Sequence, residues 1–245
     1  MSSLYHYQRI VALLSEKTMA SELLLRSNGK MTLKEVLFNP KVLVNDIDKL
    51  TDAKVNHAIQ LREEQGVSSI FVNYSPLQVE SNGFLRALDK LDVLIEMGMI
   101  VVIEITEDSE CNSPIQVTRN VRTARYKGYS IAIDDFGAGN SNYNSLYDLQ
   151  PSIVKLDQKI IRQAALGGRA KDGFYQLIEL LKNLEFKVIV EGIETYDELA
   201  VARKSRADFA QGFYFHKPSP VTDQTPKSDN GEDSGVVVDF NSASA

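Results

Sequence analysis

The sequence predicts an α/β fold, a (β/α)8 TIM-like barrel with an antiparallel first strand. Short β-branched runs alternate with longer stretches that carry apolar residues at helical spacing, which is typical of a parallel sheet covered by helices. About eight strand candidates fall within roughly 215 residues, as a (β/α)8 barrel requires. Only Ser15 to Lys17 separate the first two candidates, too few residues for a parallel crossover, so these two should pair antiparallel. The same pattern leaves a doubly wound open sheet as an alternative.

The elements follow in a regular order. Strand candidates, recognised by their β-branched and apolar residues, lie at 5–13, 18–25, 68–74, 99–105, 129–133, 153–156, 187–190 and 209–215. Helix candidates, recognised by apolar residues at helical spacing, lie at 46–65, 83–96, 113–126, 157–184 and 196–205. Past Pro220 the chain becomes rich in Thr, Asp, Ser, Asn and Gly. We therefore predict a barrel domain over residues 1–220 and a flexible polar tail over 221–245, with a partner-binding peptide or an edge strand as alternatives for the tail.

Composition excludes several classes of protein. The 245 residues are 43% hydrophobic and 24% charged, values of a globular chain rather than a disordered, collagen-like or membrane-bundle one. Apolar runs such as Met97 to Ile103 are far shorter than the roughly 20 residues that cross a bilayer. The stretch 4–14 carries His6, Gln8 and Arg9 and is a poor signal peptide. We therefore expect no membrane insertion and a cytoplasmic location.

Net charge and cysteine content exclude some binding partners and some kinds of site. The formal net charge is −6 and no basic run is present, so duplex nucleic acid is not expected as a partner. A single cysteine, Cys111, excludes an internal disulfide and a cysteine-rich zinc site, in keeping with a reducing compartment.

Polar residues stand late in the predicted strands or where they end. They are Glu22, Asn73, Glu104, Asp134 with Asp135, Lys155, Glu191 and Gln211, in the second to the eighth strand. The carboxyl ends of barrel strands converge on one mouth, so these side chains should meet there. Buried carboxylates need partners or a metal ion. Carboxylate and amide oxygens suit Mg²⁺ or Mn²⁺ better than Zn²⁺, and a pair of such ions suits in-line attack at phosphorus.

A series of motifs resembles those of one family. Ser21-Glu22-Leu23-Leu24-Leu25-Arg26, Val72-Asn73-Tyr74-Ser75, Glu104-Ile105-Thr106-Glu107, Asp134-Asp135-Phe136-Gly137, Lys155-Leu156-Asp157, Glu191-Gly192-Ile193-Glu194 and Gln211-Gly212 resemble, in this order, the motifs of EAL-domain cyclic-di-GMP phosphodiesterases. Seven motifs in sequence between Tyr5 and Pro220 make the resemblance specific. It implies a barrel with an inverted first strand that hydrolyses one phosphodiester bond of cyclic-di-GMP, giving linear pGpG, through two-metal activation of water.

The resemblance also implies roles for individual residues. Glu22, Asn73, Glu104 and Asp134 resemble the ligands of one ion, and Asp134, Asp135 and Glu191 those of the other, each ion being Mg²⁺ or Mn²⁺ with Ca²⁺ inhibitory. Lys155, Glu191 and Glu22 are the expected catalytic residues, and Lys155 would orient the attacking water. Arg26 and Gln211 would bind substrate. Glu107, Glu194 and Asp157 would support the ligands from behind, Glu107 by fixing the loop after Asp135.

Departures from the family pattern keep other functions open. Ala138-Gly139-Asn140-Ser141-Asn142 replaces Thr-Gly-Tyr-Ser-Ser, and the tail has no helical period where a closing helix would be expected. An inactive cyclic-di-GMP receptor or protein-binding regulator is therefore the second hypothesis, and an enolase-type Mg²⁺-dependent barrel enzyme is a third. Two residues also have purely structural interpretations. Lys155 could form an ordinary ion pair with Asp157, and Asn73 could be a hydrogen-bonded amide at the end of its strand. A homodimer and a protein partner remain possible partners by analogy.

Overall fold

Eight strands form a closed ring in the computed structural model, which describes residues 4–27, 32–37, 39–106, 111–138 and 143–221. The strands are β1 (Tyr5–Ala12), β2 (Thr18–Leu25), β3 (Ser69–Tyr74), β4 (Ile100–Thr106), β5 (Ser130–Phe136), β6 (Ile153–Leu156), β7 (Lys187–Val190) and β8 (Phe209–Ala210). From β2 to β8 each strand pairs in parallel with the next. The (β/α)8 barrel prediction is confirmed.

The first strand closes the ring in the opposite direction. β1 pairs antiparallel with β2 along nearly its whole length and antiparallel with β8 at Val11 and Ala12. A tight turn joins β1 to β2, and Glu16 takes a φ of 55° in that turn. This confirms the inverted first strand, because the short connection allows only a hairpin.

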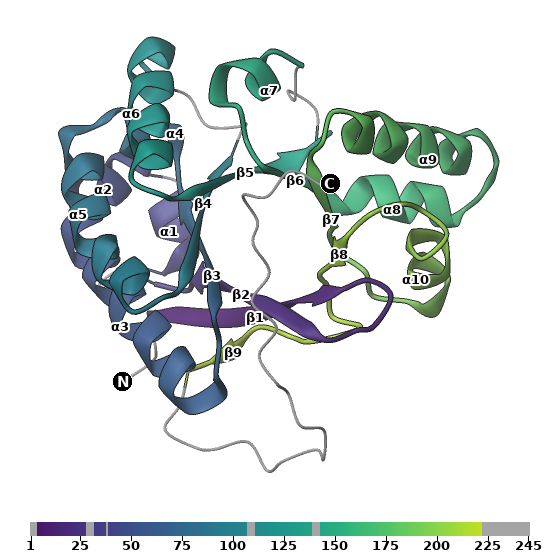
Figure 1. Cartoon of the computed structure of the whole chain (residues 1–245), viewed down its shortest axis with the longest axis horizontal. Coiled ribbons are helices and arrows are strands. Elements are labelled where there is room, and N and C mark those ends of the chain that lie inside the picture. The colour runs from purple at the N-terminus through teal and green to yellow at the C-terminus, as the bar shows by residue number, and fades with distance from the viewer. Residues whose placement is uncertain (1–3, 28–31, 38, 107–110, 139–142, 222–245) are drawn as a thin grey trace.

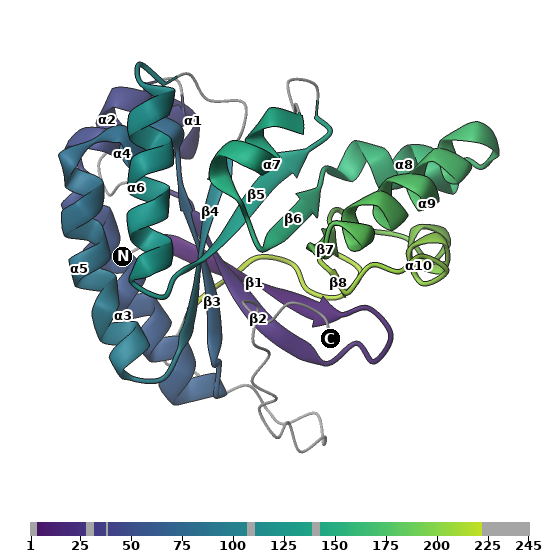
Figure 2. The ribbon, with the colours of Figure 1, turned by 45° about the horizontal axis from the view of Figure 1, so that its top comes forward.

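Ten helices lie in the described chain, mostly on the outside of the ring (Figures 1 and 2). They are α1 (Leu33–Leu37), α2 (Pro40–Asn45), α3 (Ile47–Gln65), α4 (Pro76–Glu80), α5 (Asn82–Glu96), α6 (Pro114–Tyr126), α7 (Tyr143–Leu149), α8 (Gln158–Ala165), α9 (Gly168–Asn183) and α10 (Tyr196–Ala202). No helix follows β8 as far as the structure describes the chain, which ends at Val221.

The core has an inner and an outer part. Inside the ring, Ile10, Phe71, Val102, Ile153 and Ile189 belong to one cluster and are fully buried. Two further clusters fill the space between the sheet and the helices. Residues of both faces of the central strands are thus removed from water, which explains why these strands read as nearly continuous apolar runs. A polar side chain in such a strand must find its partners inside the protein.

Several predicted boundaries differ from the structure. The stretch 157–184, predicted as one helix, is two helices that meet at Gly167 and Gly168, whose φ values of 90° and 61° suit glycine and interrupt a helix. The eighth strand, predicted to run to 215, ends at Ala210. A short ninth strand, β9 (Ser219–Pro220), pairs with β1. The predicted tail lies outside the described residues except for Val221, which is buried against the core.

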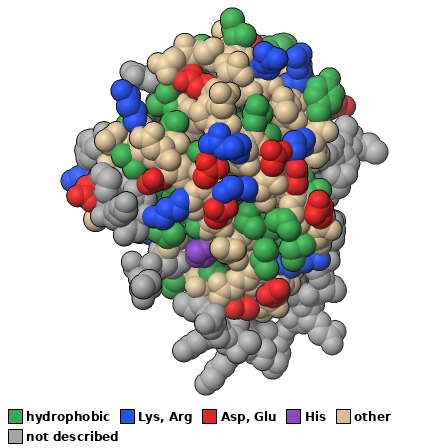
Figure 3. Space-filling model, turned by 90° about the vertical axis from the view of Figure 1, so that its left-hand side faces the viewer, with side chains coloured by type: hydrophobic (Ala, Val, Ile, Leu, Met, Phe, Trp, Pro, Cys, Tyr) green, Lys and Arg blue, Asp and Glu red, His purple; other side chains and the backbone are tan. Residues whose placement is uncertain are grey.

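The face formed by α3 and α5 carries mixed charge (Figure 3). Arg86 pairs with Asp48, and Lys90 pairs with Asp52, so acidic and basic side chains alternate there instead of forming a basic surface. None of the helices in the described chain is long and apolar enough to cross a membrane.

Candidate active site

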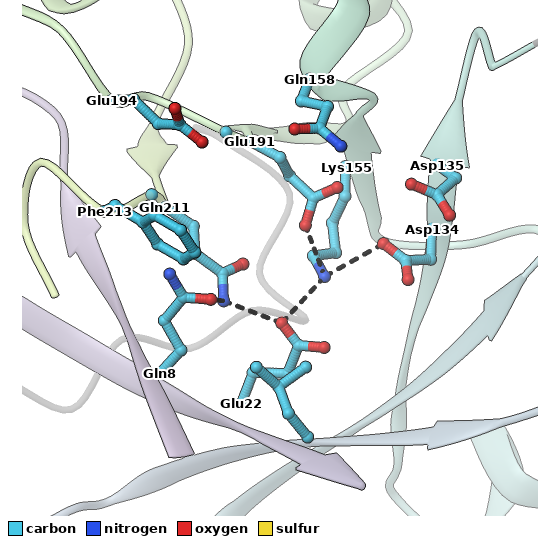
Figure 4. A pocket seen from close by; sticks show the side chains of 13 residues that line it. Gln8, Glu22, Asp134, Asp135, Lys155, Gln158, Glu191, Glu194, Gln211 and Phe213 are labelled. Atoms are coloured by element: carbon cyan, nitrogen blue, oxygen red, sulfur yellow. Dashed lines mark hydrogen bonds and ion pairs between the residues drawn. The ribbon is translucent and has the colours of Figure 1, made fainter. Parts of the chain in front are cut away.

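Lys155 lies at the centre of a ring of carboxylates at the mouth of the barrel (Figure 4). Its Nζ atom is 2.7 Å from Glu104 Oε1, 2.8 Å from Glu191 Oε1, 3.0 Å from Asp134 Oδ1 and 3.2 Å from Glu22 Oε2. These residues come from β2, β4, β5 and β6 and from the residue after β7. The structure therefore brings together the acidic side chains that the sequence scatters over 170 positions, from Glu22 to Glu191. It gives Lys155 these four partners rather than the alternative Asp157.

Burial makes the charges of this cluster strongly interdependent. Lys155 is 1% exposed, Glu104 0% and Glu22 4%. Burial raises the pKa of Glu104 and of Glu191 well above the ordinary value, and neighbouring carboxylates add to the effect. Burial alone would lower the pKa of Lys155, but the surrounding carboxylates outweigh it and raise that pKa well above its usual range. Lys155 therefore keeps its proton among these carboxylates, whereas Glu104 and Glu191 readily bind protons or other cations.

Glu22 is held in place by amides. Asn73 Nδ2 donates to Glu22 Oε1 at 2.8 Å, and Gln211 Nε2 donates to Glu22 Oε2 at 2.8 Å. Burial pushes the pKa of Glu22 upward, but Lys155 and these two amides outweigh it, so the pKa is lowered. Gln211 also donates to Gln8 Oε1 at 3.3 Å. Sequence reasoning missed Gln8, although the antiparallel register opposes it to Glu22.

Asp134 and Asp135 both face the pocket although they are neighbours in a strand (Figure 4). Consecutive strand residues normally point to opposite faces. Asp135 has a φ of 56°, and the pairing of β5 with β6 shifts register between Ile133 and Phe136. This irregularity turns both carboxylates to one side. Oxygen atoms of Asp134, Asp135 and Glu191 lie within 4.8 Å of one another, close enough to share a cation.

The donor set fits a hard divalent cation. The acidic residues of the cluster would bind a cation through carboxylate oxygens, the ligands that Mg²⁺ and Mn²⁺ prefer. Glu104 Oε2 is buried and accepts no hydrogen bond from the described residues. A buried oxygen without a partner is costly, and a bound cation would satisfy it.

The other predicted residues lie around this centre. Arg26 follows β2, and its Nη1 is 3.4 Å from the Leu25 carbonyl oxygen. Glu194 reaches the pocket wall but pairs with Arg162 at 2.9 Å. Asp157 caps α8, since its side chain accepts the Lys159 N–H at 2.8 Å. Glu107 lies outside the described residues.

Two cavities border the carboxylates. One of about 310 Å³ lies beside Lys155, and its walls include Gln158 and Phe213 and the carboxylates of Glu22, Asp134, Asp135 and Glu191. The other, of about 360 Å³, has several leucines in its walls and is also lined by Arg26. Glu22 and Asp134 line both. A ligand could therefore extend from one cavity to the other across the cluster.

Lys54 of α3 is a functional candidate that the sequence analysis missed. It is 3% exposed, and its Nζ donates to the carbonyl oxygen of Asn73 at 2.6 Å. Burial lowers its pKa to about 7, although the Glu104 carboxylate acts in the other direction. The buried stripe of α3 is Ile47, Leu50, Thr51, Lys54, Ala58 and Leu61. A lysine in the middle of an apolar stripe is the signal that could have found it.

Comparison with known proteins places the chain in a family. A family model described as "EAL domain" matches residues 2–218. The chain belongs to the EAL domain family. The resemblance inferred from seven short motifs is thereby confirmed.

Curated relatives of this EAL domain are named for activity on cyclic di-GMP. Probable cyclic di-GMP phosphodiesterase PdeG of Escherichia coli is 26% identical over 155 residues, which are 63% of this chain and 31% of PdeG. A cyclic di-GMP phosphodiesterase of Pseudomonas aeruginosa is 29% identical over 174 residues, 69% of this chain and 30% of the relative. The EAL domain described here thus spans about a third of the length of these relatives.

Solved structures share the fold. An EAL domain protein from Listeria monocytogenes matches 89% of this chain and 88% of its own with a TM-score of 0.72 and 25% identity. Klebsiella pneumoniae BlrP1, solved with manganese and cyclic-di-GMP, matches 88% of this chain and 55% of its own with a TM-score of 0.73 and 23% identity. BlrP1 was also solved with calcium and the same nucleotide.

Proposed function

We propose that this EAL domain is a metal-dependent phosphodiesterase that hydrolyses one phosphodiester bond of cyclic-di-GMP and releases linear pGpG. The observation that carries the proposal is the ring of four carboxylates around Lys155, with Asp135 beside it, at the mouth of the barrel. Family membership and relatives named as cyclic di-GMP phosphodiesterases support the choice of substrate.

The oxygen donors divide into two sets that share Asp134. Glu22, Asn73, Glu104 and Asp134 would hold one divalent cation, and Asp134, Asp135 and Glu191 the other. Bound cations of this kind lower the pKa of water and neutralise charge on attacking and leaving oxygens. In the reaction, water attacks phosphorus, the bond from phosphorus to one ribose oxygen breaks, and that oxygen leaves as a hydroxyl.

Lys155 contributes charge and hydrogen bonds in this scheme. Because the surrounding carboxylates raise its pKa well above the usual range, we assign Lys155 to orienting water rather than to accepting its proton. Its ammonium group can orient water and stabilise the negative oxygens of the phosphoryl group. Arg26, at the wall of the second cavity, would bind a phosphate of the substrate.

A hydrolysis assay tests the proposal. Purified protein is incubated with cyclic-di-GMP and Mg²⁺ or Mn²⁺, with and without a chelator, and the products are separated by chromatography. We expect linear pGpG only without chelator, and inhibition by Ca²⁺. Glu179→Gln, at an exposed residue that pairs with Arg206, is the matched control for substitutions of the ligands. Folded protein that leaves the nucleotide intact with both metals would refute the proposal, and tight binding in Ca²⁺ under those conditions would favour the receptor.

A further inference from the structure

Lys54 is a buried lysine that the proposed reaction does not use. Within the described chain it forms no ion pair with an acidic side chain, and its ammonium group has two close contacts. One is the hydrogen bond to the Asn73 carbonyl oxygen. The other is the ring of Tyr74, whose centroid lies 3.3 Å from Nζ. Burying a polar amino group without an acidic partner costs free energy, so an apolar residue would serve the packing of α3 better.

Both contacts are at the carboxyl end of β3. β2 pairs with β3 only as far as Leu23 and Val72, whereas β4 continues alongside β3 to the pair Tyr74 and Ile105. Asn73 is thus the first residue of β3 beyond its pairing with β2. Lys54 supplies a hydrogen-bond donor to the backbone at this residue.

The Tyr74 ring provides a fixed support for the ammonium group. The Tyr74 hydroxyl lies 2.9 Å from Thr51 Oγ1, and the ring packs edge-on against Phe84 at 5.3 Å. Since Thr51 and Lys54 are three residues apart on α3, one helix face holds both the ring and the carbonyl before it. The end of β3 is therefore tied to α3 through side chains.

The Asn73 side chain faces the carboxylates. Its Nδ2 atom donates to Glu22 Oε1 at 2.8 Å, and the cavity that Lys54 lines is also lined by Glu22 and Asp134. Movement of the Asn73 backbone would therefore move the amide away from Glu22. Substitution of a group that orients a metal ligand typically lowers metal affinity by about 10- to 100-fold.

We propose that Lys54 is a positioning residue for the carboxylate site: its ammonium group holds the Asn73 carbonyl at the end of β3 and keeps the Asn73 amide directed at Glu22. The proposal rests on the proposed function, because it treats Glu22 and Asn73 as part of a divalent-cation site. Lys54 itself contacts no reacting group in this scheme.

The test compares Lys54→Met with Thr51→Val. The first removes the donor to Asn73, whereas the second removes the hydrogen bond to Tyr74 from the same helix face and leaves the Asn73 contact in place. Binding of Mn²⁺ alone, after removal of metal by a chelator, is measured by calorimetry and by the electron paramagnetic resonance spectrum of the bound ion. We expect Lys54→Met to weaken Mn²⁺ binding about tenfold and to alter the spectrum, with no fall in the unfolding temperature. Thr51→Val, which loosens the Tyr74 ring but keeps the donor to Asn73, should weaken binding less.

A second measurement needs no metal. Hydrogen exchange of the Asn73 side-chain amide, followed by nuclear magnetic resonance, should be faster in Lys54→Met than in the parent and in Thr51→Val. If Lys54→Met does not fold, Lys54→Arg retains a donor, and affinity close to the parent's supports the proposal whereas a tenfold loss contradicts it.

The outcomes separate the two proposals. A parent protein that binds no Mn²⁺ would remove the proposed function, and amide exchange would then decide the role of Lys54. If the parent binds Mn²⁺, equal or tighter binding by Lys54→Met would overturn the positioning role and leave the proposed function standing.

Discussion

Replacing Lys155 with methionine is the most direct test of how the cluster is held together. Methionine keeps an unbranched side chain of similar length but removes the cation that contacts four carboxylates at 2.7–3.2 Å. Removing one partner of a buried ion pair costs about 3–5 kcal/mol, because the remaining charge is left unpaired. In chelator and at neutral pH, we therefore expect Lys155→Met to lower the free energy of unfolding by about that amount.

The loss of stability in Lys155→Met should become smaller as pH falls. Glu104 and Glu191 already have raised pKa values, and without the ammonium group they should bind protons at still higher pH. When the pKa of a carboxyl group is higher in the folded state than in the unfolded state, the fold loses stability as pH rises above the unfolded-state pKa. The difference between variant and parent should therefore shrink as pH falls, because Glu104 and Glu191 then bind protons and no longer carry unpaired charge.

Urea denaturation followed by circular dichroism measures both effects. Lys127→Met is the matched control, since Lys127 also contacts two carboxylates, at 3.0 Å and 2.6 Å, but is 33% exposed. Exposed pairs contribute only about 0–1 kcal/mol. Added Mn²⁺ should restore much of the stability of Lys155→Met, because bound cations replace the missing charge. A loss below about 1 kcal/mol in chelator, equal to that of an exposed pair, would refute this account of the cluster.

Three further predictions concern the site and its frame. Glu22→Ala and Glu191→Ala should each lower hydrolysis of cyclic-di-GMP by several orders of magnitude while changing the unfolding temperature little, since each removes a ligand and also relieves carboxylate repulsion; near-normal turnover would contradict the assigned roles. Gly212→Ala should destabilise the protein by about 3 kcal/mol in urea denaturation, because an ideal Cβ would lie 2.1 Å from a backbone oxygen of the adjacent segment, whereas Gly173→Ala, with nothing within 4 Å in α9, should stabilise it slightly. Burial lowers the pKa of His216 from 6.5 to about 4, so the unfolded state binds the proton first as pH falls and stability drops through this window. His216→Gln should reduce that drop by about 1–2 kcal/mol after allowance for the partial exposure of the ring, and an identical pH profile would show that His216 does not contribute.

The barrel was predictable because its strands are recognisable one at a time. β3 to β7 are short apolar runs, and the hairpin length alone fixed the direction of β1. The short helices α1, α2, α4 and α7 were not predicted, because five to seven residues give too little periodicity to recognise. The break between α8 and α9 was visible in principle, since Gly167 and Gly168 stand side by side.

The site was only partly predictable. Each acidic residue stands late in a strand or just after it, so the barrel geometry brought them together without further information. The hydrogen-bond and ion-pair partners of the surrounding residues were harder to predict, because they depend on the direction of each side chain. Asp157 caps α8, which a residue before a helix commonly does. Glu194, in the segment between β7 and α10, pairs with Arg162 of α8.

The charge of the carboxylate cluster bears on the proposed number of bound cations. Glu22, Glu104, Asp134, Asp135 and Glu191 offer five carboxylates around one ammonium group, so the fully ionised cluster has a net charge of −4. Two divalent cations neutralise that charge. A single divalent cation leaves a net charge of −2 in a largely buried site. Glu104 and Glu191, whose pKa values are raised, would then bind protons and reduce that charge. We infer that full loading requires both carboxyl groups to be ionised, and that metal binding therefore weakens as pH falls.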